Sequence, residues 1–322
     1  MAVIRMRTGR VLRVVRTSEG MVELDVEVEG RIDRAIAYPP MTGPVSEGAT
    51  VQLNTTAVAW GLGTGGHHFV MAVEGQEDLD PSPGGHVMKL RYTPLQVKVE
   101  AVEEPQSPHR ELLETAESLD GMPVVWVPLH SMVGAVCAGA GVAGAQRVVY
   151  VMTDGAALPL WYSRQVRVLR EAGLLGAVVT CGQALGGDLE AVNVFSGLLA
   201  ARAVLRAEVV VVGDGPGKVG TATRWGSSEI AGGLALNVAA ILGGRPVAAI
   251  RVNFTDPRPR HRGLSIHSLT VLTRVALSAV DVAVPVLEEG QREEVWAALR
   301  EAEVDRRHHL VEIDGSPAVD LL

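Results

Sequence analysis

Two different patterns of apolar residues divide the chain. Up to residue 75, short runs alternate apolar and polar positions, which is typical of half-buried strands. Turn-forming residues such as Gly20, Gly30 and Gly48 separate these runs. The runs lie at 11–15, 22–28, 34–38, 49–54 and 68–73. The pattern predicts a small antiparallel β-barrel of the SH3 or OB type over residues 1–75.

The pattern changes after an acidic, proline-containing linker at 76–85. From residue 86 to 322, buried apolar runs alternate with segments of helical length. Strands are predicted at 123–128, 147–152, 176–181, 208–213, 246–252, 280–286 and 309–313, with 96–102 as a candidate eighth strand at an edge. Helices are predicted near 107–119, 130–141, 159–172, 196–206, 227–242, 267–278 and 291–303. This alternation predicts an α/β domain with a mainly parallel, doubly wound sheet and helices on both faces.

Composition narrows the classes of function. The 322 residues are 47% hydrophobic and carry a formal charge of −8, which argues against a nucleic-acid partner. Cys137 and Cys181 are too few for a disulfide framework or a closed zinc site, so we expect reduced thiols and a cytoplasmic location. Gly, Arg or Pro interrupts the apolar runs, which argues against a membrane segment. The apolar excess, together with the small residues of 136–145, predicts a homodimer or larger homo-oligomer.

Polar and glycine residues follow several of the predicted strands. They occupy the strand-ending segments 128–131, 153–155, 181–183, 213–215 and 253–268. In open α/β sheets, ligands bind beyond the carboxyl ends of the strands, so these loops are the place for a site. Turn chemistry alone produces much of the same pattern.

A glycine-rich loop, GDGPGKVGTATRWGSSE, follows the strand 208–213. Gly215, Gly217 and Gly220 have the G-x-G-x-x-G spacing, but the strand is a late one and the helix begins beyond the loop, unlike a dinucleotide fingerprint. A Walker loop is excluded by the spacing before Lys218. With Thr221, the loop forms either an anion-binding nest or a simple chain reversal.

The segment RVNFTDPRPRHRGLSIHS at 251–268 is dense in charge. Arg260 and Arg262 are candidates to bind a phosphate or carboxylate, and Asp256 joins them as a candidate ligand-binding residue. The alternative is that the arginines pair with surface carboxylates of an acidic protein.

Three residues are candidates for acid–base chemistry. Asp154, at the end of the strand in VMTDGAALP, either binds a divalent cation or transfers a proton, or it caps a helix or starts a turn. An imidazole can transfer a proton near neutral pH, so His261 and His267 are candidates, but His267 also falls in the first turn of a predicted helix. The spacing of the two histidines is not a metal signature.

Six stretches in this order resemble a family of uncharacterised bacterial proteins, the domain of unknown function 3866. They are LNTTAVAWGLGTGGHHFV, GHVMKLRYTPLQVKVEAVEE, VMTDGAALPL, GQALGGDLEAVNVFSGLLAAR, GPGKVGTATRWGSS and RHRGLSIHS. The resemblance covers nearly the whole chain and implies a bacterial cytoplasmic protein. It assigns no catalytic residue, ligand or reaction.

The residues themselves favour a small-molecule hydrolase or transferase that acts on a phosphorylated or other anionic metabolite. In this hypothesis Arg260, Arg262 and the 215–220 loop with Lys218 hold the anion, while Asp154 and a histidine supply acid–base chemistry or ligate a divalent cation. The alternatives are a non-catalytic metabolite-binding or regulatory module and a structural homo-oligomer.

Overall fold

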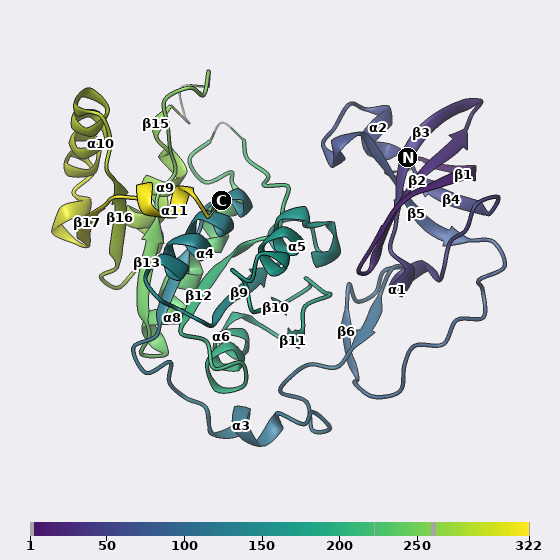
Figure 1. Ribbon diagram of the computed structural model, residues 1–322, viewed down its shortest axis with the longest axis horizontal. Coiled ribbons are helices and arrows are strands. Elements are labelled where there is room, and N and C mark those ends of the chain that lie inside the picture. Colours follow the sequence, from purple (N-terminus) through teal and green to yellow (C-terminus); the bar gives the residue numbers. More distant parts are fainter. Residues whose placement is uncertain (1–2, 222, 259–261, 322) are drawn as a thin grey trace. The chain divides into compact units, whose positions relative to one another are not determined.

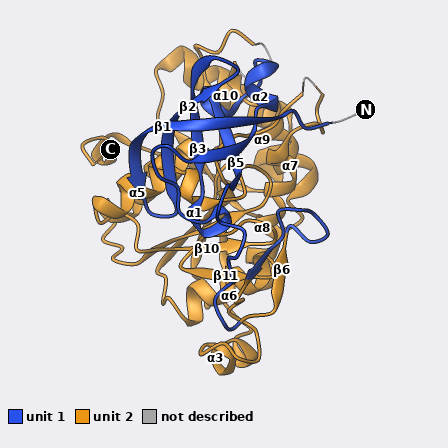
Figure 2. Ribbon diagram, turned by 90° about the vertical axis from the view of Figure 1, so that its right-hand side faces the viewer, with its two compact units in different colours: residues 1–84, 90–98 blue, residues 85–89, 99–322 orange. Residues whose placement is uncertain are grey.

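A computed structural model describes residues 3–221, 223–258 and 262–321 (Figure 1). The chain divides into two compact units, which Figure 2 colours separately. One unit comprises residues 1–84 and 90–98, and the other comprises 85–89 and 99–322. The first contains the predicted barrel and the second contains the predicted parallel sheet.

The first unit is a closed five-stranded barrel in the order β1-β2-β3-β5-β4. Its strands are β1 (Met6–Ser18), β2 (Met21–Val28), β3 (Arg31–Ala37), β4 (Thr50–Asn54) and β5 (His67–Val73). The short helices are α1 (Pro39–Thr42), α2 (Thr56–Ala59) and the 3-10 turn η1 (Thr64–Gly66). Neighbouring strands are antiparallel except β3 and β5, whose parallel pairing closes the barrel. Alternate residues such as Leu24 and Val26 fill its interior, as the period-2 pattern predicts.

The second unit contains an eight-stranded sheet in the order β11-β10-β9-β12-β8-β13-β16-β17, in which all paired strands are parallel. The strands are β8 (Pro123–Trp126), β9 (Val148–Thr153), β10 (Ala177–Cys181), β11 (Leu189–Ala191), β12 (Val209–Asp214), β13 (Arg245–Ala249), β16 (Asp281–Pro285) and β17 (His309–Ile313). This parallel sheet confirms the predicted fold class. Its strands are buried apolar runs such as β9, which require helices on both faces.

Helices cover both faces of this sheet. The longer ones are α3 (Arg110–Thr115), α4 (Val133–Val142), α5 (Arg164–Glu171), α6 (Val194–Ala203), α8 (Leu234–Ile241) and α10 (Glu289–Glu301). Shorter turns are η2 (His130–Met132), η3 (Leu160–Tyr162), α7 (Ser228–Gly232), α9 (Ile266–Thr270), the π-helical η5 (Val271–Val275), η6 (Val304–Arg306) and α11 (Ser316–Val319). Side chains of α4 and α5 pack into one core, and those of α6, α8 and α10 pack into the other. The remaining short strands are β6 (Val87–Lys89), β7 (Val97–Val99), β14 (Val252–Asn253) and β15 (Gly263–Leu264).

The candidate eighth strand at 96–102 is wrong, because the edge strand beside β10 is β11. Within 96–102, Val97–Val99 forms β7, which pairs with β6 in a separate two-stranded sheet. The segment meets the parallel sheet only through an isolated bridge between Ala101 and Glu190 of β11. Within the described residues, no helix has both the length and the apolar composition needed to cross a membrane.

Candidate functional site

A crevice is expected where the connections of two adjacent strands leave in opposite directions. β9 leads through α5 to β10 on one side, and β12 leads through α7 and α8 to β13 on the other. Their helices also pack on opposite faces of the sheet. Because β9 and β12 are neighbours, the topological switch point lies between their carboxyl ends. Thr153 ends β9 and is followed by Asp154 and Gly155, and Asp214 ends β12 and is followed by Gly215.

Asp214 is the most perturbed carboxylate at this point. Burial raises its pKa above the ordinary value, and the negative charge of Asp154 adds to the increase. The hydroxyl of Thr153 donates to Asp214 Oδ1 at 2.6 Å and, with the amide of Gly155, partly opposes the rise. A side chain at position 155 would clash with the carboxylate, since a Cβ there would lie 2.4 Å from Asp214 Oδ2. The backbone therefore approaches this acid as closely as only glycine allows.

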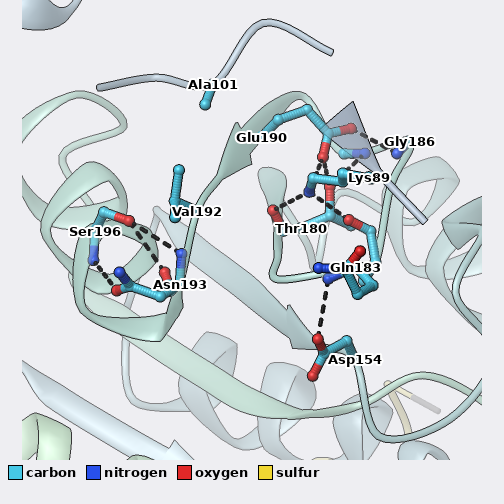
Figure 3. Close-up of polar contacts among 12 residues, drawn as sticks. Lys89, Ala101, Asp154, Thr180, Gln183, Gly186, Glu190, Val192, Asn193 and Ser196 are labelled. Carbon is cyan, nitrogen blue, oxygen red and sulfur yellow. Dashed lines mark hydrogen bonds and ion pairs between the residues drawn. The ribbon is translucent and has the colours of Figure 1, made fainter. Parts of the chain in front are cut away.

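Asp154, one of the predicted catalytic residues, is exposed beside it. Its Oδ2 accepts a hydrogen bond from the amide of Gln183 at 3.0 Å, as Figure 3 shows. Gly182 makes room for this contact, because a Cβ at that position would lie 2.2 Å from the same oxygen. The loops after β9, β10 and β12 thus meet around two carboxylates.

A buried ion pair fixes the loop that carries Gln183. Lys89 Nζ lies 2.7 Å from Glu190 Oε2 and also donates to the carbonyl oxygen of Ala184 (Figure 3). Lys89 is only 1% exposed. The hydroxyl of Thr180 and the amide of Gly186 donate to the same carboxylate, which satisfies its remaining lone pairs. The sequence carries no local signal for this pair, because the partners lie 101 positions apart.

A second polar network lies at the carboxyl end of β8. His130 Nε2 is 2.7 Å from Ser163 Oγ, and its Nδ1 is 3.3 Å from Tyr150 Oη. Tyr150 donates to the backbone oxygen of Asp214 at 2.8 Å, so the network supports the start of the glycine loop. Burial lowers the pKa of His130 to about 4, and the ring is therefore neutral at pH 7. Ser163 also caps α5 by accepting from the amide of Val166. The sequence pattern places His130 in a strand-ending loop but gives it no role.

The glycine-rich loop forms a hydrogen-bonded hairpin. The amide of Thr221 donates to the oxygen of Gly226, and the amide of Ser228 donates to the oxygen of Val219. Gly220 bridges Ser227 across it. Gly215 is buried where the hairpin begins, and Gly217 is exposed with a positive φ of 91°. Two of the amides that an anion nest would use are therefore engaged within the hairpin.

Lys218 lies at the base of this hairpin and pairs with Glu229. The carboxylate of Glu229 is buried, and it also accepts from the hydroxyl of Ser268 at 2.7 Å. His267 is fully buried, and its Nε2 lies 3.1 Å from the backbone oxygen of Thr223. These contacts join the glycine loop to the 251–268 segment, two of the regions that the sequence singles out.

Within 251–268, Asp256 holds the loop through two arginines. Its carboxylate lies 3.0 Å from Arg251 and 2.8 Å from Arg258. The hydrogen bonds from Arg258 hold its pKa far below the ordinary range, with a smaller contribution from the charge of Arg251. Arg262 is exposed. Arg260 and His261 lie outside the described residues.

The contacts bring together part of the predicted site. The loops after β9 and β12 touch directly, since the amide of Ala157 donates to the oxygen of Pro216 at 2.9 Å. The loop after β12 in turn reaches His267 and Ser268. Across the described ranges, no cluster of three or more His, Cys, Asp or Glu side chains has the arrangement of a metal site. Sequence reasoning did not select Asp214 as a catalytic candidate, although it directly follows the predicted strand 208–213, which is the same signal that selects Asp154.

The fold and the two carboxylates define a class: an open, parallel α/β protein with two acids at its topological switch point, preceded by a small barrel. The chain belongs to the family described as a protein of unknown function (DUF3866), whose profile matches residues 34–322. A search of curated proteins and a search of solved structures each gave no significant match.

Proposed function

We propose that the protein is a small-molecule hydrolase or transferase that acts on a phosphorylated or other anionic metabolite in the crevice between β9 and β12. The observation that carries the proposal is the pair Asp154 and Asp214, in which burial and the neighbouring charge raise the pKa of Asp214. Carboxyl groups with a raised pKa at a strand-end crevice are typical of acid–base catalysts.

The two acids have different roles in this proposal. Asp214 is partly buried, and its raised pKa suits it to give or take a proton near the reacting bond. Asp154 is exposed and suits a divalent cation, since Mg²⁺ is commonly held by one or two carboxylates together with substrate phosphates. Such a cation would also let an anionic substrate approach two negative side chains. The exposed Arg262 is the candidate to bind the far end of the anion.

Other predicted site residues have supporting roles in this proposal. Lys218 and Asp256 are each neutralised by a protein partner, and His267 is buried beneath the glycine hairpin. They fix the loops that form the wall of the crevice. A non-catalytic metabolite sensor would use the same wall, so turnover is the property that separates the two functions.

The test measures binding and turnover together. A panel of phosphorylated and carboxylated metabolites is screened by thermal shift with and without Mg²⁺, because a ligand that prefers the native state raises its melting temperature. Each binder is then assayed for hydrolysis or group transfer. We expect Asp214→Asn to lower kcat/KM by about 100-fold or more, the contribution usual for a positioned acid or base.

The matched control is Asp305→Asn, which changes an exposed carboxylate beyond the crevice. Equal losses in both variants would contradict a catalytic role for Asp214. Binding without turnover of any ligand would support the sensor instead.

We also propose that the protein works in the cytoplasm as a homodimer or larger homo-oligomer. Both cysteines are unpaired and buried, which agrees with a reducing compartment. Leu234 and Ile241 at the two ends of α8, and Leu277 beside this helix, are more than half exposed. Light scattering that gives a mass near 34.0 kDa at every concentration would contradict the oligomer.

A further inference from the structure

The barrel contains a second candidate site, independent of the crevice in the parallel sheet. A cavity of about 520 Å³ opens at one end of the barrel, between the β2–β3 turn and α2. All of its lining residues belong to the first unit. Its volume is within the range of pockets that bind small molecules, and the mouth of a barrel is a common place for one.

The walls combine apolar surface with charge. Arg31 and Asp33 alternate along β3 and therefore share a face, and His68 on β5 lies beside them, with Nε2 3.3 Å from Asp33 Oδ2. Val28 and Val58 supply the apolar part of the lining. This combination resembles ligand pockets in which apolar walls surround a few placed polar groups.

Trp60 is the most unusual lining residue. It follows α2 directly and is 74% exposed, although a tryptophan side chain gains more than most from burial. The indole offers a flat apolar face at the rim of the cavity. An exposed tryptophan at a cavity is suited to stack on a planar ring.

The charges of the cavity are compensated except at one position. Arg5 pairs with Glu29 at 2.7 Å, and hydrogen bonds from Arg7 and Arg5 lower the pKa of Glu29 to about 2. Asp33 faces His68. Arg31 is exposed and makes no ion pair with any carboxylate in the part of the chain that the structure describes. Its guanidinium is therefore available to an anion from solution.

We propose that this cavity binds a small molecule that joins a planar aromatic ring to an anionic group, of the size of a nucleoside monophosphate. The ring stacks on Trp60, and the phosphate forms a charge-assisted, bidentate contact with Arg31. Asp33 and Glu29 accept hydrogen bonds from hydroxyl or amino groups of the ligand. The barrel is then a ligand-binding module, separate from the crevice of the α/β unit.

The test uses the full chain and isothermal titration calorimetry with AMP, GMP, CMP and UMP. Matching nucleosides supply the ring without the charge, and ribose 5-phosphate supplies the charge without the ring. We expect at least one monophosphate to bind, and both partial ligands to bind at least about tenfold more weakly, because each loses one of the two contacts. Trp60→Leu and Arg31→Gln should each weaken binding by about tenfold or more and leave the melting temperature unchanged, since both side chains are exposed.

Matched controls locate the site. Trp225→Leu changes another exposed indole, and Arg10→Gln changes another exposed arginine of the barrel; neither should alter binding. Absence of binding by all four monophosphates at millimolar concentration would overturn the proposal, as would ribose 5-phosphate binding as tightly as a monophosphate. Because a monophosphate is also a phosphorylated metabolite, Asp214→Asn is titrated in parallel. Binding that depends on Asp214 or Trp225 and not on Trp60 would overturn the barrel site and support the crevice.

Discussion

Asp214 ends β12, and Asp256 lies in the chain that leaves β13 and passes through β14, yet the surroundings of the two acids act in opposite directions. Asp256 lies between Arg251 and Arg258, which hold its pKa far below the ordinary range. Asp214 is partly buried beside another carboxylate, and its pKa is raised. The arginines of its own loop stabilise the ionised form of Asp256, whereas the surroundings of Asp214 favour its protonated form.

The comparison shows that a loop with many charged residues is not for that reason the better candidate for a catalytic site. The 251–268 segment is the most charged loop of the sheet, but its acid is satisfied by arginines of the same segment. The 153–155 and 213–215 turns carry only two acids, and these acids accept hydrogen bonds from hydroxyl and amide groups. A carboxylate without a cationic partner in the protein can be stabilised by a bound cation or substrate. The 153–155 and 213–215 turns are therefore the better candidate site.

The largest expected effect tests whether Lys218, like Asp256, is needed to neutralise an oppositely charged partner in the protein. Lys218→Met leaves the buried carboxylate of Glu229 without its cation and should lower the free energy of unfolding by about 3–5 kcal/mol, measured by urea denaturation. The double variant Lys218→Met/Glu229→Gln should recover part of the loss. Arg300→Met, at an exposed position of α10, is the control. If Lys218→Met unfolds with the same free energy as the wild type, Lys218 would again be a candidate anion-binding residue.

The next effect concerns the histidine beside the glycine loop. Because burial lowers the folded-state pKa of His130 to about 4, the unfolded chain takes up the proton first as the pH falls below 6.5. Stability should therefore decline by up to about 3 kcal/mol between these two pH values. His130→Gln should show a flatter profile in denaturation experiments across this range. An unchanged slope would mean that His130 is charged or solvated in the native state.

A smaller effect compares how ionisation of Asp214 and of Asp256 changes the free energy of unfolding. Above its ordinary value of 3.8, ionisation of Asp214 costs stability because its folded-state pKa is raised. Ionisation of Asp256 contributes stability above 3.8, and this contribution is lost as the pH falls below that value. At pH 7, Asp214→Asn should therefore maintain or raise stability, and Asp256→Asn should lower it. The change in Asp214→Asn should be on the order of 1 kcal/mol.

Both stability differences should shrink when the unfolding experiments are repeated at pH 3. Shifts of the same sign at pH 7 would remove the electrostatic distinction between the two loops.

The smallest effect is at Arg262. Arg262→Ala should change the free energy of unfolding by less than about 0.5 kcal/mol, as expected for an exposed side chain. It should also remove most of the thermal shift caused by an anionic ligand, and added salt should weaken that shift in the wild type. A large loss of stability without ligand would make Arg262 a structural residue.

The positions of the elements could be predicted because apolar periodicity is local. The runs 147–152 and 208–213 are continuous and bounded by turn residues, and they form β9 and β12 within one residue at each end. The edge of the sheet could not be predicted in the same way. β11 has only three residues, whereas 96–102 has the stronger alternation, and the parallel edge is chosen by packing against β10.

The sequence by itself determined the segments that form seven of the eight strands of the parallel sheet, and that polar loops gather at one edge of it. Only the tertiary structure decided which charges meet there. Thr153 and Asp214 are 61 positions apart, and Lys89 and Glu190 are 101 positions apart, so neither contact can be predicted from local spacing in the sequence. A pKa shift depends on burial and on the sign of the nearest charges, and both are properties of the packed fold. For this reason the sequence could propose Asp154 and Asp256 alike, and only the fold could separate an acid held by arginines from an acid held beside another acid.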